Sequence, residues 1–246
     1  MILFDHVCFD YTDNQPAMKN VNLTIAHGES IAVVGANGAG KSTLLQLAAG
    51  LLAAKKGSIT VDGIPVHPKN SAILKKKVGY IGQDNTHQTD MTVTDYIAGA
   101  PRGCGYTEAD VKSLTAYAIK IMHLETLTNQ NLQALSCGER RTAAIAAMLA
   151  KQPSVMILDD PTAFLDAKAK HSLTNTLQIL HHTKVIATHD LDLALALCAK
   201  VIVLKEGSVY AYGNAQTLLC NVGLLRACNL ELPLSAQKYN TYIYRK

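Results

Sequence analysis

The sequence predicts an α/β fold with a mostly parallel central sheet, an antiparallel β subdomain and a helical subdomain. Three observations carry this prediction. Apolar strand patterns alternate with helical patterns in the second half of the chain, which is typical of parallel sheets. Residues 1–34 alternate apolar and polar side chains, as an antiparallel layer does. Residues 85–134 switch to helical periodicity.

Length and composition fit one large domain of this class. The chain has 246 residues, 48% of them hydrophobic, which allows a sizeable core. The net charge of +4 is mild and argues against a dedicated nucleic-acid binder. The longest nearly apolar runs, 143–150 and 193–199, are shorter than the ~18 residues that a bilayer span needs. No signal-peptide pattern is visible, and six cysteines without a C-x-x-C pair favour reduced thiols.

The individual elements follow from the apolar patterns and the turn residues between them. Strands are expected at 2–10, 21–25, 30–34, 58–68 (with a turn), 78–83, 154–158 and 184–188. Helices are expected at 43–52, 135–151, 167–180 and 190–199, and within 85–134 with interruptions at Pro101, Gly103 and Gly105. A terminal hairpin is expected from 201–204 and 208–212 around Glu206-Gly207.

The stretch from Gly35 to Thr43 carries the clearest chemical signal. It reads G-x-x-x-x-G-K-S between a strand and a helix, which is the P-loop pattern. Its glycines let backbone N–H groups turn inward around an anion, and the helix N-terminus adds a positive dipole end. Lys41 is expected to reach the β- and γ-phosphates, and Ser42 to offer its hydroxyl to Mg²⁺. The sequence therefore predicts binding of a nucleoside triphosphate.

Two adjacent carboxylates, Asp159 and Asp160, follow the apolar run at 155–158. Sheets of this class bind ligands at the carboxyl ends of their strands. Asp159 fits the Mg²⁺-associated acid of a P-loop NTPase, and Asp160 fits a carboxylate that polarises the attacking water. The alternative is a pair of turn or helix-capping acids before Pro161, and the P-loop favours the catalytic interpretation.

Two further positions are candidates for phosphate contacts. Ser136 and Glu139 form an S-x-x-E capping box, so a helix begins there, and its first N–H groups and the Ser136 hydroxyl are expected to be available to an anion. A plain helix cap is the alternative. His189 ends an apolar strand at 185–188 and is expected to donate to a γ-phosphate, the alternative being a structural histidine.

Together these motifs resemble the nucleotide-binding subunit of ABC transporters, over about residues 2–232 and in the family's order. The resemblance implies an ATP-binding domain at 1–232 with a helical subdomain at about 85–152, and a tail at 233–246. It implies ATP as the nucleotide and Mg²⁺ as the metal. The residues that it places at the nucleotide are Tyr11, which stacks on adenine, the Walker A residues Gly35, Ala36, Asn37, Gly38, Ala39, Gly40, Lys41, Ser42 and Thr43, and the signature residues Ser136 and Gly138.

The same resemblance implies the catalytic and metal-binding roles. Gln83 matches the Q-loop glutamine, which senses Mg²⁺ and water and faces the membrane partner. With it, Asp160 and His189 match the catalytic residues, and the metal set is Ser42, Gln83 and Asp159. Residues 163–166 match the D-loop.

The resemblance also implies an assembly and a location. The signature of one subunit closes over the P-loop ATP of a second ABC ATPase, identical or paralogous, in a head-to-tail dimer. An integral membrane transporter subunit is a separate chain, with residues 85–105 as the candidate docking surface, and no nucleic acid is expected. The chain is then peripheral, on the cytoplasmic face of the cell membrane. Residues 90–99, 190–204 and 224–233 are similar to the ATPases of energy-coupling-factor importers of cobalt, nickel and vitamins, patterns shared with metal-chelate importers.

Two departures from the family pattern leave alternatives open. Asp160 stands where glutamate is usual, which retracts the carboxylate by roughly 1.5 Å. Because a misplacement of ~1 Å can cost about a hundredfold in rate, slow hydrolysis is expected. Cys137 stands where glycine is usual and crowds a close backbone approach to phosphate. The alternatives are a degenerate ATP-binding regulatory or assembly module, or a soluble ABC ATPase outside transport; co-purification with a membrane subunit or with nucleic acid separates the latter.

Overall fold

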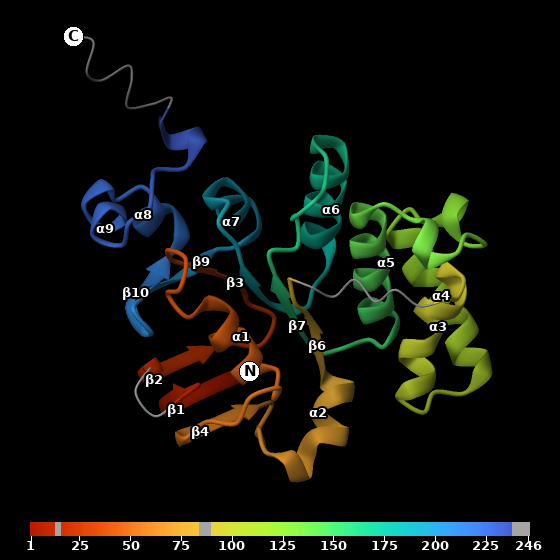
Figure 1. Cartoon of the computed structure of the whole chain (residues 1–246), viewed down its shortest axis with the longest axis horizontal. Helices are drawn as coiled ribbons and strands as arrows, with labels where there is room; N and C mark the ends of the chain where they lie inside the picture. The colour runs from red at the N-terminus through yellow and green to blue at the C-terminus, as the bar shows by residue number, and fades with distance from the viewer. Residues whose placement is uncertain (13–15, 84–89, 238–246) are drawn as a thin grey trace. The chain divides into compact units, whose positions relative to one another are not determined.

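The computed structural model describes residues 1–12, 16–83 and 90–237, and these form two compact units (Figure 1). Unit 1 is Met1–Leu74 with His182–Lys246, and unit 2 is Lys75–His181. The expected helical segment, 85–152, falls within the sequence of unit 2, although its residues 85–89 and the tail residues 238–246 lie outside the described residues. Parallel strands, antiparallel strands and helices are all present, which confirms the α/β class.

The first sheet of unit 1 is antiparallel, as the alternating pattern of the first residues predicts. Its order is β2-β1-β4-β5. The strands are β1 (Ile2–Asp10), β2 (Pro16–Ile25), β4 (Lys56–Val61) and β5 (Ile64–Pro65). The inward side chains of β1 and β2, among them Phe4, Val7 and Met18, are buried, and they form one apolar face.

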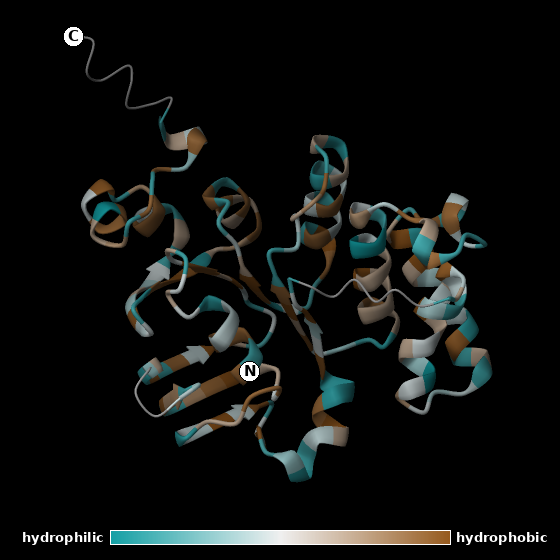
Figure 2. Ribbon diagram, in the orientation of Figure 1, coloured by the Kyte–Doolittle hydropathy of each residue, from teal (hydrophilic) through white to brown (hydrophobic). Residues whose placement is uncertain are grey.

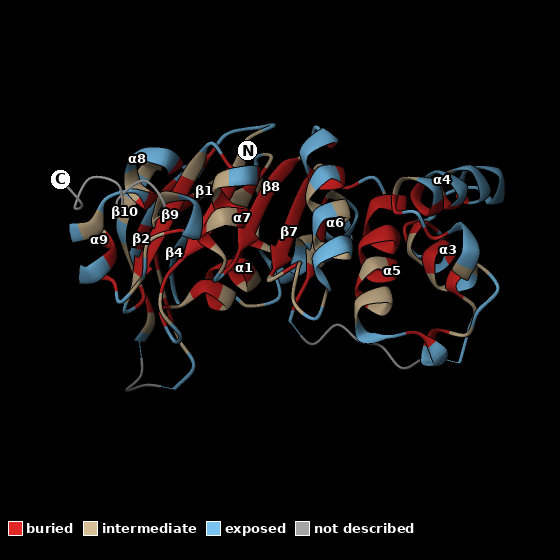
Figure 3. Cartoon of the chain, turned by 90° about the horizontal axis from the view of Figure 1, so that it is seen from above, coloured by how far each residue is buried: buried red, intermediate tan, exposed pale blue. Residues whose placement is uncertain are grey.

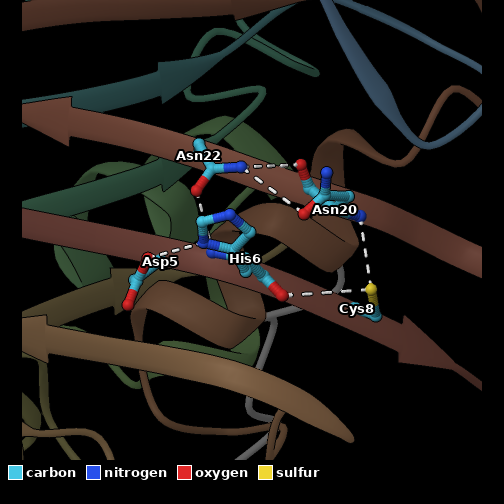
Figure 4. A network of polar contacts seen from close by, with 5 residues as sticks. All are labelled: Asp5, His6, Cys8, Asn20 and Asn22. Atoms are coloured by element: carbon cyan, nitrogen blue, oxygen red, sulfur yellow. Dashed lines mark hydrogen bonds and ion pairs between the residues drawn. The ribbon is translucent and has the colours of Figure 1, made fainter.

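Strand β1 bulges where it passes β2 and β4. Its register shifts between Asp5 and Cys8, and His6 has a φ of 49°. Figure 4 shows how polar groups fill the irregular segment: His6 donates its backbone N–H to Asn22 Oδ1 at 2.9 Å, and Asn20 donates its own to Cys8 Sγ at 3.3 Å. These bonds give partners to polar groups at the bulge of this inner strand.

A second group of strands in unit 1 has the order β10-β9-β3-β8. Strand β3 (Ser30–Val34) runs parallel to both β8 (Thr183–Ala187) and β9 (Lys200–Lys205). Figure 2 shows β9 in hydrophobic colours, and its residues 201–204 are fully buried. Strand β10 (Ser208–Asn214) returns antiparallel, which confirms the hairpin around Glu206-Gly207. The helices are α1 (Lys41–Ala48), α7 (Leu191–Leu197), α8 (Ala215–Leu219) and α9 (Val222–Ala227).

Unit 2 combines two parallel strands with a group of helices. Strands β6 (Val78–Ile81) and β7 (Val155–Asp159) pair in parallel. Helices α3 (Val93–Gly103), α4 (Glu108–Ile121) and α5 (Cys137–Ala150) pack on one another, and α6 (Ala167–Ile179) follows β7 in sequence. Figure 3 shows much of α5 buried. Helix α2 (Ser71–Lys77) contains the point at which the chain passes from unit 1 to unit 2.

One of the expected interruptions in the helical segment is corrected. Pro101 does not interrupt it, because α3 runs through this residue. The helix ends at Gly103, and Gly105 follows in the break with a φ of 79°. Pro101 is buried, and the packing of α3 against α4 and α5 outweighs the hydrogen bond that a proline removes. Helices α8 and α9 were not expected, because each is shorter than two turns and shows little periodicity.

Across the described ranges, no helix combines the length and the apolar character that a membrane span requires.

Candidate functional site

The P-loop begins where β3 ends and closes at the first turn of α1. Gly40 occupies the N-cap position of α1 with a φ of 103°, and Gly38 has a φ of 77°. Both values lie in the left-handed region that favours glycine. At Gly35 the constraint is space, because a Cβ there would lie 2.6 Å from the Leu204 carbonyl oxygen. The glycines are therefore needed for the curled backbone that the sequence predicts.

Lys41 points back over this loop. Its ammonium donates to the carbonyl oxygens of Gly35 at 2.8 Å and Ala36 at 3.1 Å, and the side chain is only 8% exposed. The positive charge is therefore held at the mouth of the glycine loop. A curled backbone with a cation above it fits a phosphate group.

The loop is braced from the terminal hairpin, a contact that the sequence patterns did not reveal. Gly207 donates its N–H to the Ala39 carbonyl at 3.1 Å, and its own carbonyl accepts from Lys19 N at 2.8 Å. A Cβ on Gly207 would lie 2.6 Å from the Ala17 carbonyl oxygen. The turn residue thus joins the P-loop to β2, and only a glycine fits there.

Tyr11 lies beside the first turn of α1. Its hydroxyl hydrogen-bonds Thr43 Oγ1 at 3.1 Å, and its ring stands edge-on to Phe9 with centroids 5.0 Å apart. The ring is 57% exposed, so one face can receive another aromatic group. This placement fits the expected role of Tyr11 as a platform for adenine.

His189 lies at the same sheet edge as the P-loop. It follows β8, and the Thr188 N–H donates to the Val33 carbonyl at 3.2 Å, two residues before Gly35. The His189 side chain is exposed. Asp190 then caps α7 through a 3.0 Å bond from the Leu193 N–H, which fixes the turn that carries the histidine. Unit 1 therefore groups the glycine loop, Tyr11 and His189.

In unit 2, the two carboxylates and Gln83 stand at the ends of paired strands. Ile81 of β6 lies opposite Leu158 of β7, so Gln83 and Asp159 both emerge at the carboxyl edge. Asp159 is buried at 3% exposure, and Asp160 is partly exposed with a φ of 48°. Arg141 of α5, which the sequence patterns did not single out, donates to backbone carbonyls on both strand ends.

The predicted helix start at Ser136 is confirmed. The Ser136 hydroxyl accepts from the Glu139 N–H at 3.2 Å, and Glu139 Oε2 accepts from the Ser136 N–H at 2.8 Å. The sequence leads us to expect that this hydroxyl is available to an anion. In the structure it donates to Glu139 Oε2 at 2.7 Å and is engaged within the capping box. An anion here must therefore exchange with the Glu139 contact.

The residues after Ser136 line an open groove of about 700 Å³. Cys137 is exposed on it, and its Sγ accepts from Arg140 Nη2 at 3.2 Å. A Cβ on Gly138 would lie 3.0 Å from Leu165 Cδ2 and 3.2 Å from the Phe164 carbonyl oxygen. Gly138 thus allows the 163–166 segment to approach α5 closely. Phe164 itself is 74% exposed, with a φ of 65°.

The metal expectation can be judged by donor chemistry within each unit. Ser42, half-buried in the first turn of α1, offers a hydroxyl oxygen. Asp159 offers a carboxylate at the end of β7, and Gln83 an amide oxygen. These are the hard oxygen ligands that Mg²⁺ takes, and two or three protein ligands suit an ion that keeps phosphate and water in its coordination shell.

Comparisons with known proteins give one consistent result. Residues 18–163 match the family model described as ABC transporter. A putative ABC transporter ATP-binding protein of Geobacter sulfurreducens is 40% identical over 232 residues, covering 94% of this chain and 93% of that protein. An energy-coupling factor transporter ATP-binding protein of Methanospirillum hungatei is 34% identical and matches 92% of this chain, over 58% of its own length.

Solved structures agree with these relatives. CbiO1 of Clostridium perfringens, described as part of the ABC transporter complex CbiONQ, superposes with a TM-score of 0.82 at 30% identity over 97% of this chain and 98% of that one. The ATP-binding cassette MJ0796, in a dimeric structure with bound ADP and Pi, gives a TM-score of 0.79 at 26% identity over 87% and 99% of the two chains.

Proposed function

Since the chain belongs to the ABC transporter ATP-binding family, we propose that it is the ATPase subunit of an importer of metal ions, metal chelates or vitamins. The single observation that carries the nucleotide-binding part is the Lys41 ammonium, buried over a glycine loop at the end of β3. The import direction and the cargo class are supported by similarity to an energy-coupling factor ATPase and to CbiO1.

The residues of each unit have separate roles in the proposed reaction. In unit 1, Lys41 neutralises the β- and γ-phosphates, the 35–43 backbone cradles them, and Tyr11 holds the base. His189 donates a hydrogen bond to the γ-phosphate. In unit 2, Asp160 accepts a proton from the attacking water, while Gln83 orients that water.

Magnesium would be held by Ser42, Gln83 and Asp159. When bound, Mg²⁺ would neutralise part of the negative charge of the phosphates. The negative charge of the buried Asp159 carboxylate would then be compensated by the ion.

The proposal includes a dimer of two such ATPases and a membrane partner. Ser136 and Gly138 of each copy close over the ATP held by the other, either an identical chain or a paralogue. The dimeric form of MJ0796 and the CbiONQ complex of CbiO1 support this assembly. The transporter subunit is a separate integral membrane protein that docks on residues 85–105, so the chain is peripheral on the cytoplasmic face.

The test is the binding and hydrolysis of MgATP by the purified chain and by Lys41→Ala. The wild type should bind ATP and release phosphate. Lys41→Ala should lose at least about tenfold in ATP affinity, because the ammonium that would contact the phosphates is gone. Lys56→Ala is the matched control, since Lys56 is exposed on β4. If wild type and Lys41→Ala bind ATP equally, or neither binds it, the proposal is wrong.

A further inference from the structure

The guanidinium of Arg141 lies inside unit 2 and contacts two strand ends at once. The side chain is 2% exposed. Nη1 donates to the carbonyl oxygens of Gly82 at 2.5 Å and Gln83 at 3.2 Å. Nη2 donates to the carbonyls of Asp159 and Asp160, the latter at 2.9 Å. Each terminal nitrogen thus serves two consecutive carbonyls, one pair after β6 and the other at the end of β7.

This geometry depends on the chemistry of arginine. A guanidinium is planar and offers donors in a fixed fork, whereas a lysine ammonium is a point charge that cannot face two separated carbonyl pairs equally well. Burying a charge is costly unless its hydrogen bonds are satisfied, and an apolar side chain of similar size would pack α5 without that cost. The bonds to the strand ends, rather than packing, therefore account for a buried cation at this position.

The Asp160 backbone shows what these bonds hold in place. Asp160 has a φ of 48°, a left-handed conformation that is unfavourable for most side chains, although aspartate tolerates it better than larger residues do. Its carbonyl, turned by that conformation, accepts from Arg141. The backbone angle also sets the direction in which the short carboxylate leaves the chain. Losing the Arg141 bond would let Asp160 return to an ordinary conformation and move its carboxylate.

We propose that Arg141 is a positioning residue for hydrolysis, which holds the backbone of Gln83 and of Asp160 in register from the helix that begins at Ser136. The catalytic part of this inference rests on the proposed function, and its structural part rests on the four hydrogen bonds from Arg141 to backbone carbonyls. Since Ser136 caps α5 five residues earlier, one helix joins the signature segment to both strand ends. A shift of α5 is thereby transmitted to the residues that orient and activate the water.

The test compares Arg141→Met and Arg141→Lys with a matched control, Lys151→Met. Lys151 is a half-buried cation at the C-cap of α5, and its Nζ donates to the carbonyls of Lys75 at 2.9 Å and Val78 at 2.8 Å. The Lys151→Met variant therefore loses the same kind of hydrogen bond, from a cation to a backbone carbonyl, at the opposite end of β6. All three variants should lower the melting temperature, so kcat and KM are compared at a temperature where each is fully folded.

For Arg141→Met, kcat should fall about ten- to a hundredfold, as expected for a misplacement of ~1 Å. ATP binding measured without magnesium should be unchanged, because it depends on unit 1. Arg141→Lys should be intermediate, and Lys151→Met should keep the wild-type kcat. If Arg141→Met does not fold, Arg141→Lys alone decides. The inference is overturned if kcat of the Arg141 variants is no lower than that of Lys151→Met, or if only KM changes.

Hydrogen exchange of the nucleotide-free chain gives a second readout that needs no activity. Arg141 variants should speed amide exchange at 79–83 and 156–163, whereas Lys151→Met should speed it at 71–79. An even increase over all of unit 2 would mean that Arg141 merely stabilises the fold. If the wild type neither binds nor hydrolyses ATP, the proposed function fails, and exchange still decides whether Arg141 holds the strand ends.

Discussion

At the residue scale, Asp160 combines a short acidic side chain with an unusual backbone. The glutamate that the family resemblance leads us to expect here would extend one methylene further. The structure adds that Asp160 has a left-handed backbone, a region where aspartate is tolerated better than longer side chains. The short acid and the unusual backbone therefore belong together, and a substitution at this site changes reach and conformation at once.

We predict that Asp160→Glu raises kcat by about tenfold, because the carboxylate gains reach toward the water. Asp160→Asn should lose most hydrolysis while keeping ATP affinity, since the amide cannot accept the proton. The measurement is steady-state phosphate release with a melting curve for each variant. A turnover of Asp160→Glu that falls or stays flat contradicts slow hydrolysis by a short acid, and a wild type no faster than Asp160→Asn favours the regulatory-module alternative.

Cys137 is the second residue whose chemistry is open to test. It is exposed on the groove beside Ser136, where the proposed dimer places the partner's ATP. We predict that alkylation of Cys137 inhibits hydrolysis, because the added group occupies the space of a phosphate. Bound MgATP should slow its labelling, as measured by mass spectrometry of the modified peptide.

The cysteine controls come from the same chain. Hydrolysis by Cys137→Ala should resist the reagent. Hydrolysis by Cys220→Ala should stay sensitive, because this variant keeps Cys137 and loses only an exposed cysteine of unit 1. Undiminished turnover in fully alkylated wild-type protein would show that the groove is not part of the site.

At the element scale, α5 connects the chemistry of unit 2. Its N-terminus carries the capping box, its first turns carry Arg141, and its C-terminal half is apolar and buried. The cap and the arginine contact different segments. Ser136 closes the first turn of α5, and Arg141 donates to the carbonyls at the ends of β6 and β7. One helix therefore links the capping box to the ends of β6 and β7.

We predict that Ser136→Ala costs about 1 kcal/mol of stability through the lost cap and also weakens ATP-dependent dimerisation. Thr107→Ala is the matched control, because Thr107 caps α4 in the same way, accepting from the Asp110 N–H at 3.2 Å. Both variants should lower the urea midpoint by similar amounts, and only Ser136→Ala should shift the dimerisation curve. Equal dimerisation of the two variants would assign Ser136 to the helix cap alone.

At the scale of the whole molecule, the two units carry complementary halves of the proposed site. Unit 1 has the phosphate loop, Tyr11 and His189, and unit 2 has the acids, Gln83 and the capped helix. The proposed function gives the phosphate and base contacts to unit 1 and the water-directed roles to Asp160 and Gln83 of unit 2, while it assigns the capped helix to the ATP of a second copy.

We predict that Asp160→Asn forms a stable dimer when MgATP is added, because binding continues while hydrolysis stops. Light scattering should show twice the monomer mass with ATP and the monomer mass without it. Lys41→Ala should stay monomeric under both conditions. A paralogue requirement would appear as a dimer only when a second ABC ATPase is supplied, and a monomer under all of these conditions argues against the sandwich.

Sequence patterns were sufficient where the signal is local. The P-loop, the capping box at Ser136 and the hairpin at Glu206-Gly207 each depend on residues a few positions apart, so spacing and turn chemistry specify them. The short helices α8 and α9 and the continuity of α3 through Pro101 were not predicted, because tertiary packing rather than local preference decides them.

By itself, the sequence determined the class of fold, the longer strands and helices, and the local motifs such as the P-loop and the capping box, because these follow from periodicity and short spacings. Only the tertiary structure decided how those motifs are held. Arg141 donates to carbonyls 58 and 59 positions before it and 18 and 19 positions after it in the chain. Gly207 donates to the Ala39 carbonyl in the P-loop, which lies far from it in sequence. No local pattern marks such contacts, since the backbone carbonyl that accepts them is the same in every residue.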